Sequence, residues 1–500
     1  MHQEIAEMLP APAMVASVAP SPRANIYDPS QLILSFHREV KIAEEAEEVK
    51  VHLPAATQTL RGATPGMRAV LRSLVADGAR QDELADLLLS LDGQVSLAGL
   101  YYRIEQWKAW KVLRYTLADR ERRLLTIEPM SPKFQLKAGP IEPDAGYALS
   151  RFAFCRRLRN QIVLESPLCH ARVLLEGDAG AALIGALALP RSARELSSHA
   201  GLPEDIALTA VSLLAQLSLA VPANEDGTTQ EDHDDTLQQW NFHDLLFHSR
   251  SRVGRHDYPF GANYRFFGKI PSQPAVKPQM SGDVVGLYRP DLDALMQHDL
   301  PFTHVLETRR SVRDYADPPI SLQQIGEFLY RTARVRYLIE PFSSPGMIYQ
   351  ASSRPYPGGG AGYELELYLT VNTCDGLPSG IYHYDPLEHQ LCKLAPRNAH
   401  VEALLDGASI SAARLCVPQV LITFAARFQR MGWKYDGMAY AATLKNVGVM
   451  YQTMYLVATA MGIAPCGLGS GNSDLLAQAA GLDYLKESSV GEFMLGSRAS

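Results

Sequence analysis

The sequence has few cysteines and arranges them in no recognisable motif. Its six cysteines are scattered singly, and no two of them have C-x-x-C spacing. No cysteine and histidine group has the spacing of a zinc finger, so no metal site is predicted. The thiols are expected to be reduced and mostly buried in a cytoplasmic protein. The start of the chain, Met1-His2-Gln3-Glu4, lacks the positive region and the apolar core of a secretory signal.

The chain also lacks a positive charge excess and an uninterrupted apolar run. Lysine and arginine total 47 against 54 acidic residues, for a net charge of −7, which argues against nucleic acid as the main partner. The apolar stretch 442–466 contains Lys445, Asn446 and Gln452. It is predicted to be a buried or dimer-interface helix and not a membrane span.

Several nucleotide and hydrolase motifs are missing as well. The sequence has no G-x-G-x-x-G after a predicted strand, no Walker loop and no nucleophile elbow. A dinucleotide-binding Rossmann domain, a P-loop enzyme and an α/β-hydrolase therefore have no support.

Composition and periodicity divide the 500 residues into five segments. Residues 1–29, rich in proline and alanine, are predicted to be a flexible lead-in. Extended runs and helical stripes then occur twice, and predict winged-helix-like modules over 30–140 and 141–222. The acidic and the Pro/Gly-rich parts of 223–290 predict a linker and an extended arm. Residues 291–500 remain as a C-terminal domain.

The second module offers a peptide-binding or DNA-binding interpretation. Ser192 and Glu195 fit a capping box, and a turn at Gly201 joins two short helices. Because residues 203–217 carry no excess of arginine or lysine, DNA recognition is disfavoured. The histidines in 240–248 are five residues apart, which predicts a packed aromatic helix and not a metal site.

The last two hundred residues bring together an arginine cluster and two glycine-rich segments. The run 308–315, T-R-R-S-V-R-D-Y, holds three guanidiniums and a hydroxyl within five positions. This density suits an anionic ligand, although a solvated basic helix end would have the same sequence. The segments 355–362 and 465–471 each allow a backbone to approach a flat ligand closely.

The most informative pair is Lys434-Tyr435, which precedes a long apolar helix. Asp436 is predicted to be the N-cap of that helix, which runs to Met461 and ends at Gly462. The positive end of the helix dipole disfavours an ammonium and favours a phenolate. Both groups are thereby moved toward forms that accept a proton near neutral pH.

These motifs resemble the nitroreductase superfamily over residues 300–500. Members are flavoproteins that bind FMN at a homodimer interface. The resemblance implies an α+β fold: a C-terminal nitroreductase-like FMN domain with a mixed sheet flanked by helices, preceded by the two winged-helix-like modules. The residues implied to bind FMN are Arg309, Arg310, Ser311, Arg313, Pro357, Gly358, Gly359, Gly467, Leu468, Gly469 and Arg498. Many relatives have serine at the position of Gly358, so a backbone contact alone is implied there.

Two longer motifs narrow the resemblance. The runs R-P-Y-P-G-G-G-A-G-Y-E-L-E-L-Y and W-K-Y-D-G-M-A-Y are similar to SagB-type and McbC-like azoline dehydrogenases. These belong to thiazole/oxazole-modified peptide and cyanobactin pathways, and their catalytic pair corresponds to Lys434 and Tyr435. The similarity extends upstream to about residue 30, and in long members the N-terminal modules are similar to leader-recognition domains.

The implied reaction is FMN-dependent oxidation of thiazoline or oxazoline rings to thiazoles or oxazoles on a peptide. Either Lys434 or Tyr435 would take the ring proton. The implied partners are an azoline-containing peptide, a second copy of the chain and, as one option, a cyclodehydratase; a carrier-protein-bound substrate stays open. Two other functions also stay open: an NAD(P)H-dependent nitro or flavin reductase, and a leader-peptide-binding scaffold.

Overall fold

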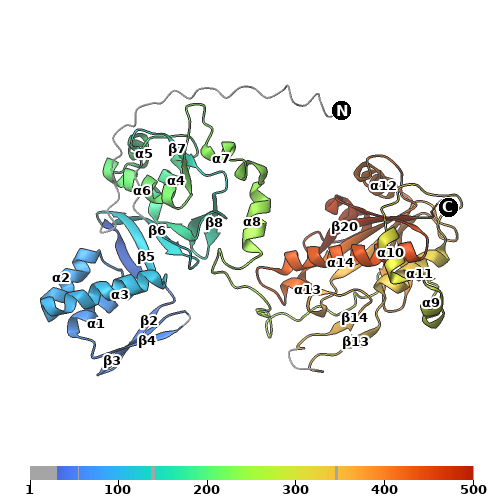
Figure 1. The fold of residues 1–500 in the computed structure, drawn as a ribbon, viewed down its shortest axis with the longest axis horizontal. Helices are drawn as coiled ribbons and strands as arrows, with labels where there is room; N and C mark the ends of the chain where they lie inside the picture. Colours follow the sequence, from blue (N-terminus) through green and yellow to red (C-terminus); the bar gives the residue numbers. More distant parts are fainter. Residues whose placement is uncertain (1–30, 55, 137–140, 344–346, 499–500) are drawn as a thin grey trace. The chain divides into compact units, whose positions relative to one another are not determined.

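The computed structural model describes residues 31–54, 56–136, 141–343 and 347–498, and the predicted lead-in 1–29 lies outside them. The chain divides into two compact units, residues 1–257 and 258–500 (Figure 1). Each unit is described by itself below.

The first unit is built on a six-stranded antiparallel sheet with strands from both predicted modules. Its order is β1-β5-β6-β10-β9-β8. The strands are β1 (Ile33–Phe36), β5 (Leu113–Asp119), β6 (Arg122–Pro129), β10 (Ala171–Leu175), β9 (Gln161–Glu165) and β8 (Phe154–Leu158). Two smaller sheets comprise β2 (Lys41–Glu44), β3 (Glu48–His52) and β4 (Thr57–Arg61), and β7 (Tyr147–Leu149) with β11 (Ala220–Pro222).

The helices of the first unit follow the predicted stripes. They are α1 (Pro65–Val75), α2 (Gln81–Asp92), α3 (Leu97–Ala109), α4 (Gly177–Ala186), α5 (Ala193–Ala200), α6 (Glu204–Gln216), α7 (Gln230–His233) and α8 (Phe242–Arg250). The capping box predicted at Ser192 and Glu195 is confirmed, and Gly201 adopts the left-handed conformation that ends α5. Trp107, Val173 and Leu214 are fully buried in one core. The two predicted modules thus share both a sheet and a hydrophobic core.

The second unit contains a seven-stranded sheet in the order β12-β17-β16-β15-β18-β20-β19. Its strands are β12 (Val284–Gly286), β15 (Leu365–Val371), β16 (Gly380–Asp385), β17 (Gln390–Pro396), β18 (Val420–Arg427), β19 (Ala464–Leu468) and β20 (Glu487–Gly496). All of its pairings are antiparallel, so the prediction of a mixed sheet is wrong. The physical reason is that β15, β16 and β17 follow one another as a meander, which reverses the chain at each short connection.

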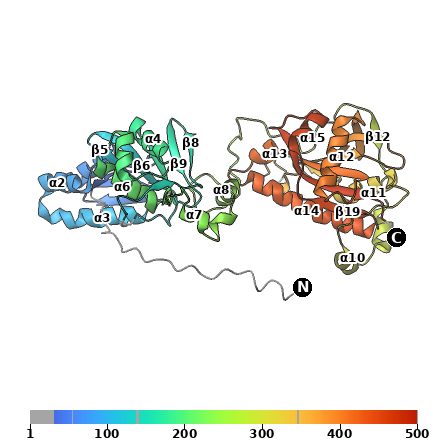
Figure 2. The same cartoon turned by 90° about the horizontal axis from the view of Figure 1, so that it is seen from above.

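Helices cover both faces of this sheet, which makes it the buried middle layer of an α+β domain. On one face lie α11 (Leu322–Ala333) and α14 (Ala439–Ala460), and on the other α12 (Ala399–Ser411) and α15 (Ser473–Ala480) (Figure 2). The remaining elements are α9 (Leu292–His298), α10 (Phe302–Thr308), α13 (Phe428–Gly432) and the hairpin of β13 (Tyr337–Ile339) and β14 (Ala351–Ser353). No helix of the described ranges is long and apolar enough to cross a bilayer.

The prediction for the start of α14 is wrong. The helix begins at Ala439, after Met438, and Asp436 does not cap it. The Asp436 carboxylate instead lies 2.8 Å from the Arg265 guanidinium and accepts a hydrogen bond from Asn263. A charged partner on a distant segment therefore outcompetes the free amides of the helix. The predicted end is confirmed, because Gly462 has a φ of 66° directly after the last turn.

The sheet carries a buried ionic group at its centre. Glu366 on β15 is 1% exposed and lies 3.0 Å from Arg427 Nε on β18 and 3.0 Å from His383 Nε2 on β16. Burial alone would raise the pKa of Glu366, but the Arg427 guanidinium and the His383 imidazole outweigh it and lower the pKa to about 2. These three strands are thus joined by charge as well as by backbone hydrogen bonds.

Glu366→Gln should destabilise this domain by about 3–5 kcal/mol at pH 7, because Arg427 would stay buried without its carboxylate. A carboxyl with a lowered folded pKa contributes stability above its unfolded pKa and loses it as the pH falls. The penalty of the variant should therefore shrink by about 3 kcal/mol between about pH 5 and pH 2. Pulse proteolysis in urea at several pH values, with detection of peptides from β15 and β16, measures this. The exposed Glu402→Gln is the control, and a pH-independent penalty would contradict the assignment.

Candidate functional site

The predicted Lys-Tyr pair lies in the turn between α13 and α14, half-buried against a glycine-rich loop. Lys434 Nζ donates hydrogen bonds to Tyr349 Oη at 2.6 Å and to the Gly360 carbonyl at 3.1 Å. The Tyr349 hydroxyl also donates to the Gly360 carbonyl. A phenol and a backbone carbonyl are thus joined at one ammonium.

Gly360 is the point at which Lys434 and Tyr435 come together. A Cβ at this position would lie 2.2 Å from Lys434 Nζ and 2.3 Å from Tyr435 Oη. The residue also has a φ of 57°, which L-residues adopt at a cost. Only glycine lets the amine and the phenol converge on the loop, which explains the third glycine of the 358–360 run.

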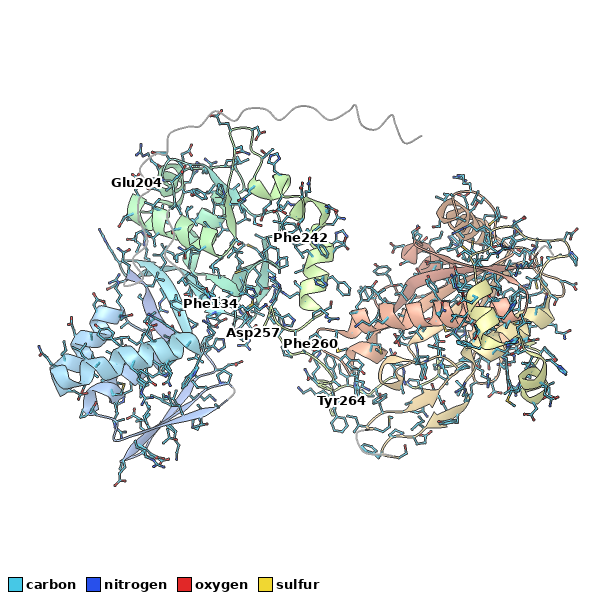
Figure 3. The ribbon with its side chains drawn as sticks, viewed as in Figure 1. Phe134, Glu204, Phe242, Asp257, Phe260 and Tyr264 are labelled. Carbon is cyan, nitrogen blue, oxygen red and sulfur yellow. The ribbon has the colours of Figure 1, made fainter. Side chains whose placement is uncertain are left out.

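Aromatic side chains surround the Lys434 ammonium. The rings of Tyr349, Tyr435 and Tyr264 have their centroids 4.8, 5.1 and 5.9 Å from Nζ. Tyr264 belongs to the arm that begins the second unit, where Figure 3 labels it with Phe260. The arm is held to the turn by hydrogen bonds from Tyr264 N to the Lys434 carbonyl and from Trp433 Nε1 to the Ile270 carbonyl. The ammonium therefore lies against the electron-rich faces of several rings.

Arg430, one turn before the pair, connects the surrounding segments. It is 5% exposed, and its guanidinium donates to the carbonyls of Gly362, Gln273 and Gln350. Burial lowers the pKa of Arg430 to about 10, so the group remains charged at neutral pH. One cation thus fixes the glycine loop, the arm and the segment of Tyr349 to α13.

The glycine loop has a second anchor on α14. Gly359 N donates to Asn446 Oδ1 at 3.0 Å, and Asn446 Nδ2 donates to both carboxylate oxygens of the buried Glu364, at 2.9 and 3.1 Å. The only signal for this role in the sequence was an amide that interrupts an apolar helix. Pro357 and Gly358, also predicted as site residues, precede Gly359 on the same loop.

The arginine cluster meets the second glycine-rich segment at Tyr455. The Tyr455 hydroxyl lies 2.7 Å from Ser311 Oγ and accepts from Gly467 N at 2.7 Å, and the Arg309 guanidinium lies 5.2 Å from the ring centroid. Val312 N donates to the Pro465 carbonyl. Two predicted site segments that are about 150 residues apart in the sequence thus lie side by side. Leu468 ends β19 as a buried residue, and Gly469 follows it, exposed.

Arg498 follows β20, and the end of this strand lies beside residues 315–316, directly after the arginine cluster. Ala316 N donates to the Ser497 carbonyl, and the Tyr315 ring packs against Gly496. Arg310, Arg313 and Arg498 are all exposed. Exposed guanidiniums next to a serine hydroxyl and a free glycine turn are chemically suited to a phosphate.

The predicted site residues form two groups within one subunit. One contains the loop 357–360 and the Lys-Tyr pair, and is anchored at Asn446; the other contains Ser311 and Gly467, and is anchored at Tyr455. These anchors are nine residues apart on α14, which is about 14 Å along the axis and about two and a half turns. The groups therefore lie on opposite sides of the helix. The described residues contain no cluster of three His, Cys, Asp or Glu residues that could hold a metal.

Three family models match the chain over consecutive ranges. Residues 29–138 match the helix-turn-helix domain of the cyanobactin oxidase ThcOx, residues 147–257 match cyanobactin oxidase ThcOx itself, and residues 306–497 match the nitroreductase family. The C-terminal part of the chain, residues 306–497, belongs to the nitroreductase superfamily. Since FMN is the cofactor of that superfamily, the chain is an FMN-dependent oxidoreductase, as the sequence predicted.

Two individual proteins and one solved structure are similar to parts of the chain. A nitroreductase-like protein of Methanocaldococcus jannaschii is 25% identical over 189 residues, 38% of this chain and 86% of the relative. The microcin B17-processing protein McbC of Escherichia coli is 33% identical over 136 residues, 26% of this chain and 47% of McbC. Among solved structures, the E. coli microcin synthetase McbBCD complex with truncated pro-MccB17 matches with 21% identity and a TM-score of 0.32, over 51% of this chain and 87% of the matched one.

Asn446→Ala should loosen the glycine loop without unfolding the domain, because Gly359 N loses its acceptor. Amide exchange in residues 357–362 should become about tenfold faster, the effect of one lost hydrogen bond. Hydrogen-exchange mass spectrometry measures it, with Gln452→Ala on the exposed side of α14 as the control. Unchanged exchange in the loop would show that Asn446 does not hold it.

Proposed function

We propose that the protein oxidises thiazoline or oxazoline rings of a peptide to thiazoles or oxazoles, using FMN as the oxidant. The observation that carries the proposal is the convergence of Lys434 Nζ and Tyr435 Oη at Gly360. A nitroreductase that only passes electrons from a nicotinamide to a flavin has no need of an amine and a phenol at one point. The match to ThcOx and McbC supports the same substrate class.

The residues around Tyr455 fit the phosphate end of FMN. Arg309, Arg310 and Ser311 would hold the phosphate and the ribityl chain, and Arg498 would return to the phosphate from the end of β20. Arg313 would lie nearer the isoalloxazine ring. A Cβ at Gly469 would contact nothing, so the turn after Gly467 leaves open space in which a flat ring can lie against the backbone.

The separation of the two groups supports a site shared by two subunits. The loop 357–359 and the arginine cluster are anchored on opposite sides of α14, about 14 Å apart along its axis, which favours one flavin contacting the two groups from different chains. Two copies that pack α14 against each other would let the loop of one copy cover the flavin held by the other. Tyr440 and Leu444 are large exposed apolar residues on this helix and suit such an interface.

The chemistry assigned to the protein is proton transfer. Aromatisation of an azoline removes one ring proton next to the carbonyl and one hydride from the neighbouring ring carbon. FMN, when bound, supplies the hydride acceptor. Lys434 in its neutral form or Tyr435 takes the proton, and the other group orients the base or stabilises charge. An azoline is the cyclised and dehydrated form of a cysteine, serine or threonine residue, so a cyclodehydratase acting on these side chains is the partner that fits this substrate. Six free cysteines support a reducing, cytoplasmic location.

Mixing the purified holoprotein anaerobically with an azoline-containing peptide tests the proposal. The visible flavin band should bleach without NAD(P)H, and the azole should appear in the product. Lys434→Ala and Tyr435→Phe should each slow bleaching by about 10²–10⁴-fold while FMN stays bound, because proton abstraction loses its base or its orienting group. Tyr484→Phe, an exposed tyrosine of the same domain outside both residue groups, is the matched control. Full turnover in both Lys434→Ala and Tyr435→Phe would contradict the assignment of proton transfer to this pair. Bleaching by NAD(P)H alone would favour a reductase.

Arg309→Ala tests the phosphate assignment separately. Loss of a charge-assisted contact should weaken FMN binding by about 10–100-fold, whereas riboflavin, which has no phosphate, should bind equally to both proteins. Fluorescence titration of the apoprotein with the two flavins measures this difference. Arg414→Ala, an exposed arginine on the same domain, is the control. An equal loss for both flavins would place Arg309 away from the phosphate.

A further inference from the structure

Tyr349 is a buried tyrosine that the sequence motifs did not indicate. It precedes β14 and is 5% exposed, and its ring packs with Trp433 and Tyr264 at centroid distances of 6.2 and 6.4 Å. Its neighbour Gln350 accepts a hydrogen bond from Arg430 through the backbone carbonyl. The segment carrying Tyr349 is thus fixed to α13, the helix that leads into the Lys-Tyr pair.

The hydrogen bonds of the Tyr349 hydroxyl have a defined direction. The Gly360 carbonyl can only accept, so the phenol donates its proton there. The phenol oxygen then accepts from Lys434 Nζ at 2.6 Å. Lys434 Nζ also donates to the same carbonyl at 3.1 Å, which closes a small ring of hydrogen bonds.

Tyr349 is suited to hold a group and not to take a proton. Burial raises the pKa of its phenol, and the nearby Arg430 guanidinium only partly opposes this. The phenol therefore stays protonated at neutral pH, and its proton is committed to the carbonyl. Lys434, by contrast, ends a flexible four-carbon chain that needs fixed partners to keep Nζ beside Tyr435 Oη.

We propose that Tyr349 is a positioning residue, which holds Lys434 Nζ against Gly360 and beside Tyr435 during azoline oxidation. The inference rests on the proposed function, because it gives Tyr349 a role in that reaction. Without the phenol oxygen, Nζ keeps only the carbonyl as a partner, and the long side chain can rotate away from Tyr435. Displacements of about 1 Å at a reacting group reduce rates by about 10²-fold.

Tyr349→Phe tests the proposal because it keeps the ring and removes only the hydroxyl. Anaerobic single-turnover bleaching of the flavin by an azoline-containing peptide should slow by about 10–100-fold. The KM for the peptide, the FMN content and the rate of reoxidation by oxygen should stay as in the unaltered protein. A crystal structure of the variant should show Lys434 Nζ displaced from Gly360. Tyr382→Phe is the matched control, because it also removes a phenol–carbonyl hydrogen bond, to Pro378 at 2.7 Å, in the same domain.

Three outcomes would overturn the inference. A bleaching rate within twofold of the unaltered protein would show that the hydroxyl is not needed. A loss of FMN or of thermal stability like that of Tyr382→Phe, with no selective fall in kcat, would show a merely structural role. If the unaltered protein itself does not bleach with any azoline peptide, the proposed function fails, and this inference fails with it.

Discussion

The rest of the site depends on the hydrogen bonds of one buried cation, the Arg430 guanidinium. This guanidinium binds three backbone carbonyls from segments that are far apart in the sequence, and it does so in a buried position. A buried cation without a carboxylate partner is costly unless its donors are all used, so the three segments must be in place together. The glycine loop, the arm and the segment bearing Tyr349 are thereby coupled to α13, the helix that leads into Lys434. The turn that carries Lys434 and Tyr435 has no regular structure of its own and gains its shape from this coupling.

The sequence predicted what depends on local spacing. Helical stripes, the stop at Gly462, the capping box at Ser192 and the neighbouring Lys-Tyr pair are all set by residues close along the chain, and the structure contains them. The family resemblance added Ser311 and Gly467 as implied FMN contacts, and the structure joins both of them to Tyr455. Local spacing and the family resemblance could not reveal Tyr349 or Asn446. Both side chains hold their segments through hydrogen bonds to residues more than ten positions away in the sequence. The N-cap prediction for Asp436 failed for the same reason, since Arg265 lies far upstream.

The first unit shows a similar limit of local patterns. Two repeats of strands and helices predicted two modules, yet β6 and β10 pair and join both in one sheet. A repeated sequence pattern predicts the order of strands and helices along the chain, but it does not predict which strands pair with each other. Two successive ThcOx models match residues 29–138 and 147–257, and both matched ranges lie within this one folded body.

The position of the two residue groups on opposite sides of α14 has a genetic consequence. In a dimer built as proposed, each flavin site combines the arginine cluster of one chain with the Lys-Tyr pair of the other. A chain defective only in the cluster and a chain defective only in the pair could then assemble into a mixed dimer. One of its two sites would carry both defects and the other neither. Two inactive alleles would complement each other within one molecule, which separate and self-contained sites could never do.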